Sequence, residues 1–332
     1  MATRRSFLTS AAALLAASHA LPASAFGALK EEMARTLSIV VGFPPGGSGD
    51  TMARLIGHEA QGKIASSVLV ENRPGAGGRI AVAYVKDASP DGRTLLQAPA
   101  SSLVIYPHIY RNLAYQPLKD FSPVARIASF EFALCVGPQV PESITSFQDF
   151  EAWSRTRSEP VTYASPAEGS TGHFAGLMIA DRRGIPMVHV PYKGSAPAIQ
   201  DTIGGHIAAC CNVVSEVLPH IKDGRLRILA TTGARRSEFL PEVPTLQELG
   251  MEGVVAQEYF ALFAPANTPE NVIEEISQVV QKAVASPAVS ERLRTMGFIP
   301  DPSGPAALKS ALEEDYQRWG TVISASGFKM IE

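Results

Sequence analysis

The sequence predicts an α/β protein with mostly parallel sheets and helices on both faces of each sheet. From Ser38 onward, short apolar runs alternate with segments in which apolar residues recur every three or four positions. Such alternation of strand and helix is typical of parallel strands joined by helical connections. Pro269 opens a longer amphipathic pattern and Pro287 ends it, so we expect the chain to finish in helices.

Eight apolar runs have the length and composition of strands, and the patterned segments that separate and follow them fit helices. The predicted strands cover residues 38–41, 68–70, 94–97, 132–136, 161–164, 188–190, 207–214 and 227–231. Besides the helix that opens at Pro269, the predicted helices cover residues 51–60, 80–86, 147–155, 174–182, 197–203, 216–221, 289–296 and 305–323. The C-terminal helices are therefore expected to pack on a sheet that is already built.

Two extended apolar stretches, residues 126–135 and 254–264, are long enough to pass from one lobe of the molecule to another. The chain has no internal repeat and no low-complexity linker, so we place the lobe boundaries at these stretches. Residues 26–130 and 256–332 would then form one lobe, and residues 131–255 would form the second. A chain that crosses twice can close about its crossover strands, so we expect function to lie in the cleft between the lobes.

The N-terminus has the pattern of a secretory signal that is removed from the mature protein. Two arginines at positions 4 and 5 precede residues 7–21, which carry no acidic or basic charge, and Ala23-Ser24-Ala25 supplies a small-residue cleavage pattern. Paired arginines followed by Phe-Leu indicate twin-arginine export, with cleavage near Ala25. The alternative is a membrane anchor, which we disfavour because the apolar run is short and rich in alanine.

Composition and charge argue against nucleic acid and anionic membranes as partners. Apolar residues make up 45% and charged residues 18% of the chain, as in an ordered globular protein. Removing residues 1–25, which contain two arginines and no acidic residue, changes the formal net charge from −3 to −5. Basic residues form nothing longer than short pairs, so the sequence shows no basic block that would bind nucleic acid.

The three cysteines allow two interpretations. Cys210 and Cys211 are adjacent in the strand-like run 207–214, where neighbouring side chains face opposite ways, so only one of them could face Cys135. An oxidising compartment would permit a disulfide, but buried thiols without a bridge are the favoured interpretation. The chain lacks Cys-x-x-Cys and paired-histidine spacing, so we expect no metal site.

Two glycine-rich segments, residues 43–50 and 165–173, have the pattern of anion-binding turns. Each follows a predicted strand and leads into a predicted helix, whose N-terminus offers free N–H groups and the positive end of the helix dipole. Two such turns suggest two lobes that close on one acidic ligand. The alternatives are a tight turn in which Ser48 or Asp50 caps the helix, and a histidine at position 173 that is satisfied at its helix start.

The sequence carries no motif of an enzyme. Residues 46–50 end in aspartate where a nucleophile elbow requires glycine, and no His-Glu-x-x-His or paired-carboxylate signature occurs. Residues 71–78 lack the order of a phosphate-binding loop and are interpreted as a structural turn. The turn 191–197 could bring Lys193 or Ser195 to the border of the cleft. The residues therefore predict a binding protein with no catalytic residue and no cofactor.

Five blocks of the sequence resemble the substrate-binding receptors of tripartite tricarboxylate transporters, also called Bug receptors. They are Val-Gly-Phe-Pro-Pro-Gly-Gly-Ser (41–48), Val-Glu-Asn-Arg-Pro-Gly-Ala-Gly-Gly (70–78), Pro-Asp-Gly-Arg-Thr-Leu-Leu (90–96), His-Val-Pro-Tyr-Lys-Gly-Ser-Ala-Pro-Ala (189–198) and Leu-Pro-Glu-Val-Pro-Thr (240–245). The resemblance implies a periplasmic-binding-protein fold of type II, with two α/β lobes, two crossover strands and an interlobe ligand cleft. It also implies a periplasmic location, a small organic carboxylate as ligand, membrane permease subunits as partners, and a monomer.

The resemblance further implies which residues hold the ligand. Its carboxylate would lie between the two glycine-rich turns, and residues 99–102 would line the same pocket. The implicated residues are Phe43, Pro44, Gly46, Gly47, Ser48, Ser101, Ser102, Ser165, Gly169, Ser170, Thr171, Gly172, His173 and Asn212. Asn212 stands where many amino-acid-binding members carry aspartate, which favours a plain mono-, di- or aromatic carboxylate. Glu168 is expected on the rim or beside a cationic part of the ligand.

Two other functions are compatible with the sequence. The same lobe closure could be read by a membrane sensor kinase instead of a permease, and measurements of uptake and transcription in a deletion strain would separate these roles. An exported enzyme that acts on carboxylates is the least favoured alternative, because the nucleophile and acid–base signatures are missing.

Overall fold

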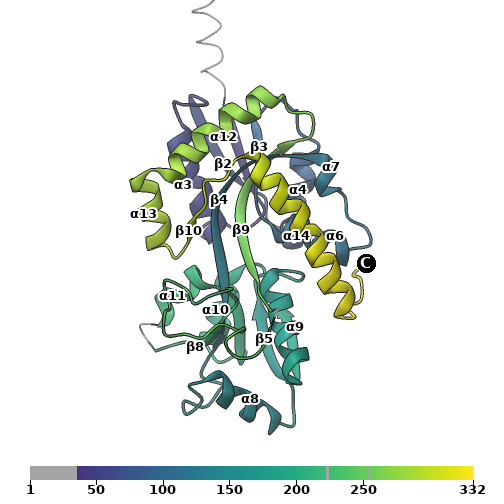
Figure 1. The fold of residues 1–332 in the computed structure, drawn as a ribbon, viewed down its shortest axis with the longest axis vertical. Coiled ribbons are helices and arrows are strands. Elements are labelled where there is room, and N and C mark those ends of the chain that lie inside the picture. The colour runs from purple at the N-terminus through teal and green to yellow at the C-terminus, as the bar shows by residue number, and fades with distance from the viewer. Residues whose placement is uncertain (1–35, 222–223, 253) are drawn as a thin grey trace, which may run out of the picture.

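The computed structural model describes residues 36–221, 224–252 and 254–332 (Figure 1). The signal predicted for residues 1–25 lies outside these described residues. Ten strands form one sheet, in which eight follow the order β2-β1-β3-β9-β4-β7-β5-β6 and the other two, β8 and β10, pair with β4. Their bounds are β1 Thr36–Val41, β2 Ser67–Asn72, β3 Thr94–Pro99, β4 Phe121–Val136, β5 Val161–Ser165, β6 Met187–Pro191, β7 Ala209–Val213, β8 Arg227–Thr231, β9 Gln257–Pro265 and β10 Ile299–Pro300.

Figure 1 shows two groups of elements joined by β4 and β9, which pair with each other through the middle of the molecule. The first lobe contains β1, β2, β3 and β10, and the second lobe contains β5 to β8. Strands β1, β2 and β3 are parallel to one another, as are β5, β6 and β7, which agrees with the predicted parallel sheets. The joining strands differ, because β9 is antiparallel to both β3 and β4.

β4 is longer than the sequence pattern indicated. Residues 132–136 were expected as a strand and 126–135 as a crossover, whereas the structure has a single strand of 16 residues from Phe121 to Val136. Its first part pairs with β9 and its last part with β7 and β8. One uninterrupted strand therefore belongs to both lobes, and β9 lies alongside it.

Helices cover both faces of the sheet in each lobe (Figure 1). Those of the first lobe are α3 (Ser48–Ala60), α4 (Arg79–Lys86), α5 (Ser101–Val104), α6 (Tyr106–Ile109), α7 (Pro117–Asp120), α12 (Glu270–Ala285), α13 (Pro287–Thr295) and α14 (Pro305–Ala325). Those of the second lobe are α8 (Phe147–Arg155), α9 (Thr171–Arg183), α10 (Ser195–Ile203) and α11 (Val214–Ile221). A short 3-10 turn, η1 (Ala76–Gly78), precedes α4. The predicted helices are all present, so the apolar periodicity predicted their positions correctly.

The central strands are buried on both faces, which explains why their apolar runs are continuous rather than alternating, whereas the edge strands β2 and β6 are only partly buried. In β1, Ile39 and Val41 belong to one core cluster and Val40 to another on the opposite face. In β7, Cys210 and Cys211 divide in the same way, and Cys210 lies directly opposite Cys135 of β4. All three cysteines are buried free thiols, as the sequence favoured.

None of the helices in the described part of the chain combines the length and the apolar character needed to cross a bilayer. The C-terminal helices α12 to α14 pack instead against the first lobe, where α14 contributes Leu308, Leu312 and Trp319 to its core. They cover a sheet whose strands lie mostly earlier in the chain.

Candidate functional site

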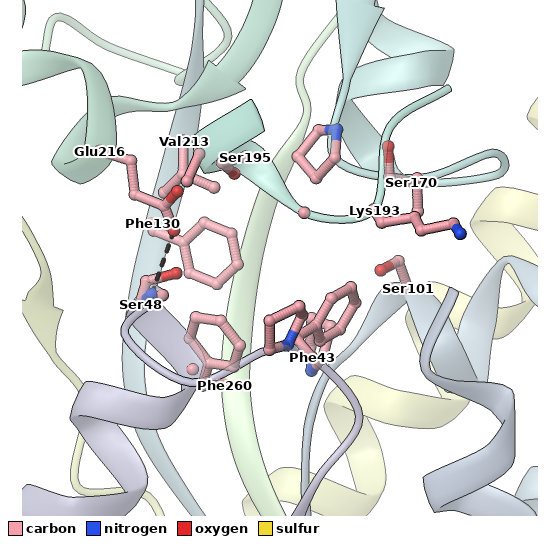
Figure 2. Close-up of a pocket in the computed structure, with 18 of the residues that line it drawn as sticks. Phe43, Ser48, Ser101, Phe130, Ser170, Lys193, Ser195, Val213, Glu216 and Phe260 are labelled. Atoms are coloured by element: carbon pink, nitrogen blue, oxygen red, sulfur yellow. Dashed lines mark hydrogen bonds between the residues drawn. The ribbon is translucent and has the colours of Figure 1, made fainter. Parts of the chain in front are cut away.

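A cavity of about 270 Å³ lies between the lobes, beside the strands that join them (Figure 2). It is lined by the turn after β1, the end of β3 and the segment that follows it, the joining strands β4 and β9, the turns before α9 and α10, and the end of β7 with the start of α11. The two turns that the sequence singled out as anion-binding therefore face one space, although they are far apart along the chain.

The first turn places five of the predicted residues along the cavity: Phe43, Pro44, Gly46, Gly47 and Ser48. Gly46 has a φ of 88°, a conformation that suits glycine. Its N–H donates to Oδ2 of Asp50 at 2.9 Å, so the carboxylate of the helix start holds the turn and does not face the cavity. Burial raises the pKa of Asp50, but hydrogen bonds from Arg54 and Gly46 outweigh burial and lower it below its usual value.

The segment 71–78 supports the first turn from outside. Asn72 donates from Nδ2 to the Phe43 carbonyl at 3.1 Å. Gly42 lies so close to Gly78 that a Cβ at position 42 would stand 2.6 Å from the Gly78 Cα. The segment is thus a structural turn, as interpreted. The absence of a side chain at Gly42 allows the two backbones to approach each other.

Ser48 connects the two lobes through its backbone. Its N–H, at the start of α3, donates to Oε1 of Glu216 on α11 at 3.2 Å (Figure 2). An acidic side chain of the protein therefore already occupies this helix N-terminus, where the sequence placed the ligand's carboxylate. Asp50 and Glu216 together account for two of the first turn's N–H groups.

In the second turn, Ser170 is the only predicted residue that lines the cavity. Its hydroxyl oxygen accepts from the His173 N–H at 3.2 Å, which makes Ser170 the N-cap of α9. The same hydroxyl donates to Oγ of Ser165 at 3.1 Å. Ser165 is fully buried, and Glu168 is exposed on the outside of the turn. Ser170 thus combines a capping role with access to the cavity.

His173 is held by the protein itself. The Gly169 N–H donates to its Nδ1 at 3.0 Å, which requires a neutral ring with its proton on Nε2. The ring stacks on His189 with centroids 3.6 Å apart. Burial lowers the pKa of His173 to about 4, and burial with the neighbouring His173 lowers that of His189 to about 3. The structure places His173 and Gly169 beside the cavity as support, outside its lining.

Four further predicted residues also lie outside the lining. Ser102 is buried and its carbonyl accepts from the Tyr115 hydroxyl at 2.7 Å, while Thr171 is buried at the start of α9. Gly172 packs on β7, because a Cβ there would lie 2.5 Å from the Cys211 carbonyl oxygen. Asn212 is fully buried in β7 between the cavity-facing Val213 and the core-facing Cys211. Ser101, by contrast, lines the cavity as predicted.

The joining strands contribute cavity residues that the sequence reasoning missed. Phe130 and Phe132 are two residues apart on β4, and Glu258 and Phe260 are two residues apart on β9. The two side chains of each pair therefore face the same side of the sheet. The rings of Phe130 and Phe260 stack with centroids 4.8 Å apart. The sequence signal for these residues was the alternation of side chains, with a period of two, along the predicted crossover stretches. It was available because any ligand between two lobes contacts the strands that join them.

Acidic side chains outnumber basic ones around the cavity. Glu216 and Glu258 line it, and among the described residues of the lining Lys193 is the one cation, exposed at the rim. Glu258 accepts from the Ser101 N–H at 2.7 Å, and burial raises its pKa. Hydroxyls of Ser101, Ser170 and Ser195 complete a mostly apolar wall. This arrangement can bind a small molecule that has both apolar and polar parts.

Two arrangements among the described residues bear on chemistry other than binding. No group of three His, Cys, Asp or Glu side chains comes together there as a metal site. The Ser165 hydroxyl lies 2.8 Å from Nε2 of His189, which is the spacing of a nucleophile and its base. Ser165 has no exposed surface and also donates to the Ala167 carbonyl, so this pair does not face the cavity.

Comparison with known proteins gives a consistent family. Residues 52–328 match the model of the tripartite tricarboxylate transporter family receptor. Protein BugT of Bordetella pertussis is 34% identical over 298 residues, which cover 90% of this chain and 91% of that protein. A protein of the TAR-I ttuE-ttuC' intergenic region of Agrobacterium vitis is 34% identical over 294 residues, covering 88% of this chain and 84% of its own.

Solved structures agree with this match. A protein of R. palustris solved with adipate is 30% identical, with a TM-score of 0.84 over 90% of this chain and 99% of that chain. MatC from Rhodopseudomonas palustris, solved with bound malate, is 28% identical, with a TM-score of 0.80 over 87% and 99%. The periplasmic binding protein BugD is 26% identical, with a TM-score of 0.82 over 90% and 99%. The predicted fold class is therefore confirmed.

Proposed function

Because the chain belongs to the family of tripartite tricarboxylate transporter receptors, we propose that it is a periplasmic receptor that captures a small organic carboxylate between its lobes. It then presents this ligand to the membrane permease subunits of such a transporter. The task is binding, and the residues of the cavity hold the ligand without transforming it.

The observation that carries this proposal is the convergence of both glycine-rich turns on one cavity. Ser101 and the first turn come from the first lobe, and Ser170, Lys193 and Ser195 come from the second. Hydroxyl groups, a lysine and the N-terminus of α10 all favour a negative group. A carboxylate between them has donors on both sides, which suits the small acids found in the solved relatives.

Closure follows from the division of the donors between the lobes. Residues 26–130 with 256–332, and residues 131–255, are the bodies that we propose to move about β4 and β9. A ligand that satisfies its oxygens only when both lobes contact it binds the closed form more tightly, and the closed form therefore becomes more populated.

A thermal-shift screen against mono-, di- and tricarboxylates and aromatic acids tests the proposal. A bound acid at 100 times its dissociation constant should raise the free energy of unfolding by about 2.7 kcal/mol. Failure of every acid to raise the melting temperature would contradict the proposed function.

The variant Ser170→Ala tests the site itself. Loss of the N-cap should lower the free energy of unfolding by about 1 kcal/mol, and loss of the hydroxyl should also weaken binding of the acid. Ser146→Ala is the matched control, because Ser146 caps α8 in the same way and lies outside the cavity lining. Equal affinities of the two variants in calorimetry would remove Ser170 from the site.

Thr171→Ala supplies a second comparison. Thr171 is buried at the start of α9 but does not line the cavity. We therefore expect its affinity for the acid to match that of the wild type, whereas the pattern of the sequence alone implicated both hydroxyls.

A further inference from the structure

The polar groups of the cavity lie on two sides, and Glu258, which accepts the Ser101 N–H at 2.7 Å, stands with the serines. In Figure 2, Ser101, Ser170 and Lys193 lie together on one side, and Glu216 lies on the opposite side beside Ser48 and Phe130. The side with the serines and the lysine suits a carboxylate. The opposite side presents another acidic group, Glu216, to the same small space.

Glu216 is held in place by the backbone of the first lobe. It is half-buried on α11, and its Oε1 accepts the Ser48 N–H, which leaves Oε2 for another donor. No lysine, arginine or histidine among the described residues forms an ion pair with it. A fixed carboxylate beside a cavity, with one oxygen available, is a place for a cation brought by the ligand.

The surroundings of Glu216 suit an organic cation in particular. Phe130, Phe132 and Phe260 line the same region, with ring centroids 4.8 Å apart for Phe130 and Phe260 and 5.7 Å apart for Phe130 and Phe132. Aromatic faces attract ammonium groups and also accept the methylene groups that carry them. A dicarboxylate would instead bring its second negative charge to an acidic side chain in a mostly apolar setting.

We propose that the ligand is a small zwitterion whose carboxylate lies near Ser101 and Ser170 and whose ammonium group is bound by Glu216 and the adjacent phenylalanines. This inference rests on the proposed function and names the class of acid that the receptor selects. It departs from the plain carboxylate that Asn212 suggested, because Asn212 is buried outside the cavity lining.

Calorimetry with acids of equal length tests this selectivity. The probes are hexanoate, 6-aminohexanoate and adipate, which end in a methyl, an ammonium and a carboxylate group, together with the corresponding sets of four and five carbons. We expect the amino acid of at least one length to bind about tenfold or more tightly than both partners of that length, as expected for a desolvated charge pair. Equal or tighter binding of the methyl- or carboxylate-terminated acids at every length would overturn the inference.

The variant Glu216→Gln then assigns the selectivity to one residue. It keeps a hydrogen-bond acceptor for Ser48 and should reduce the preference for the amino acid to within about threefold. Glu216→Asp should retain a preference, and Glu159→Gln, which makes the same charge change at an exposed position of the second lobe, should leave the preference unchanged. An increase in affinity of Glu216→Gln for every acid would show that Glu216 only competes with the ligand's carboxylate, and would overturn the proposal.

The two proposals fail in distinguishable ways. Binding of carboxylates with no preference for an ammonium group would overturn the inference about Glu216 and leave the receptor function standing. Absence of binding by every acid in every set would count against both.

Discussion

His173 shows how one residue type supports two interpretations until its neighbours are known. Its place in a glycine-rich turn suggested a contact with the ligand, and its place at a helix start suggested a histidine satisfied by the protein. In the structure its Nδ1 accepts the Gly169 N–H and its ring stacks on His189. Its neutral form therefore holds the turn that carries Ser170 to the cavity.

This arrangement predicts that the protein loses stability in mild acid. The pKa of His173 falls from the ordinary 6.5 to about 4, so in the folded state the ring stays neutral where the unfolded chain already binds a proton. The stabilisation is complete above about pH 6.5 and is lost as the pH falls toward 4, by up to about 1.4 kcal/mol per pH unit for each such histidine. Urea unfolding between about pH 7 and about pH 5 measures this slope.

His173→Asn isolates the contribution of this side chain, because an asparagine oxygen can replace Nδ1 as acceptor but does not titrate. Its free energy of unfolding should depend less steeply on pH than that of the wild type, with His189 retaining its own share. Parallel slopes for the two proteins would show that His173 does not carry the effect.

At the scale of elements, α9 illustrates why two of its glycines are needed. Gly172 meets the Cys211 carbonyl of β7, and a Cβ at Gly176 would overlap the ring of Tyr163 on β5. The helix can lie this close to the sheet only without side chains at these positions. Gly172 was implicated in ligand binding by its turn, but its contacts are those of helix packing.

Gly176→Ala should therefore destabilise the protein, by about 1–3 kcal/mol as expected for overpacking. Gly49→Ala is the matched control within a helix, since a Cβ there would stand 3.5 Å or more from its neighbours, in ordinary contact. That variant should be neutral or gain up to about 1 kcal/mol from helix propensity. Chemical denaturation of both variants measures the difference, and a Gly176→Ala protein as stable as the wild type would refute the packing argument.

At the scale of the whole molecule, the C-terminal helix links the two lobes. Phe174 of α9 packs against Trp319 of α14 with ring centroids 5.8 Å apart, and against Phe328 at 5.3 Å. This contact and the hydrogen bond from Ser48 to Glu216 are made across the lobes. Both would be altered if the lobes separated about β4 and β9.

Trp319 consequently offers a reporter of closure. The chain has two tryptophans, so Trp153→Phe leaves Trp319 as the only one. Trp319 is 2% exposed in the structure, where it contacts Phe174 of the other lobe. Separation of the lobes should expose it, so a bound acid that brings the lobes together should shift its emission to shorter wavelengths. The companion variant Trp319→Phe should show no such shift. Binding detected by calorimetry without any change in Trp319 emission would argue against motion at this contact.

Periodicity and turn residues were sufficient for the longer helices and strands and for the position of the two turns, but they did not indicate α5, α6, α7 or β10. They were insufficient for the cavity wall. Phe130 and Glu258 lie on strands that were expected to cross between lobes, but which face of such a strand meets the cavity depends on its pairing register. The contact of Ser48 with Glu216 joins residues 168 positions apart, and nothing local in either segment indicates it.

The sequence by itself determined the α/β class, the order of strands and helices, and the two glycine-rich turns, because these depend on interactions between residues a few positions apart. The family blocks added the type of fold and of ligand. Only the tertiary structure decided that Ser101 and Ser170 line the cavity while Ser102 and Thr171 do not. It also decided that Glu216 accepts the N–H of Ser48. Long-range packing determines which groups contact one another and which stay available to a ligand.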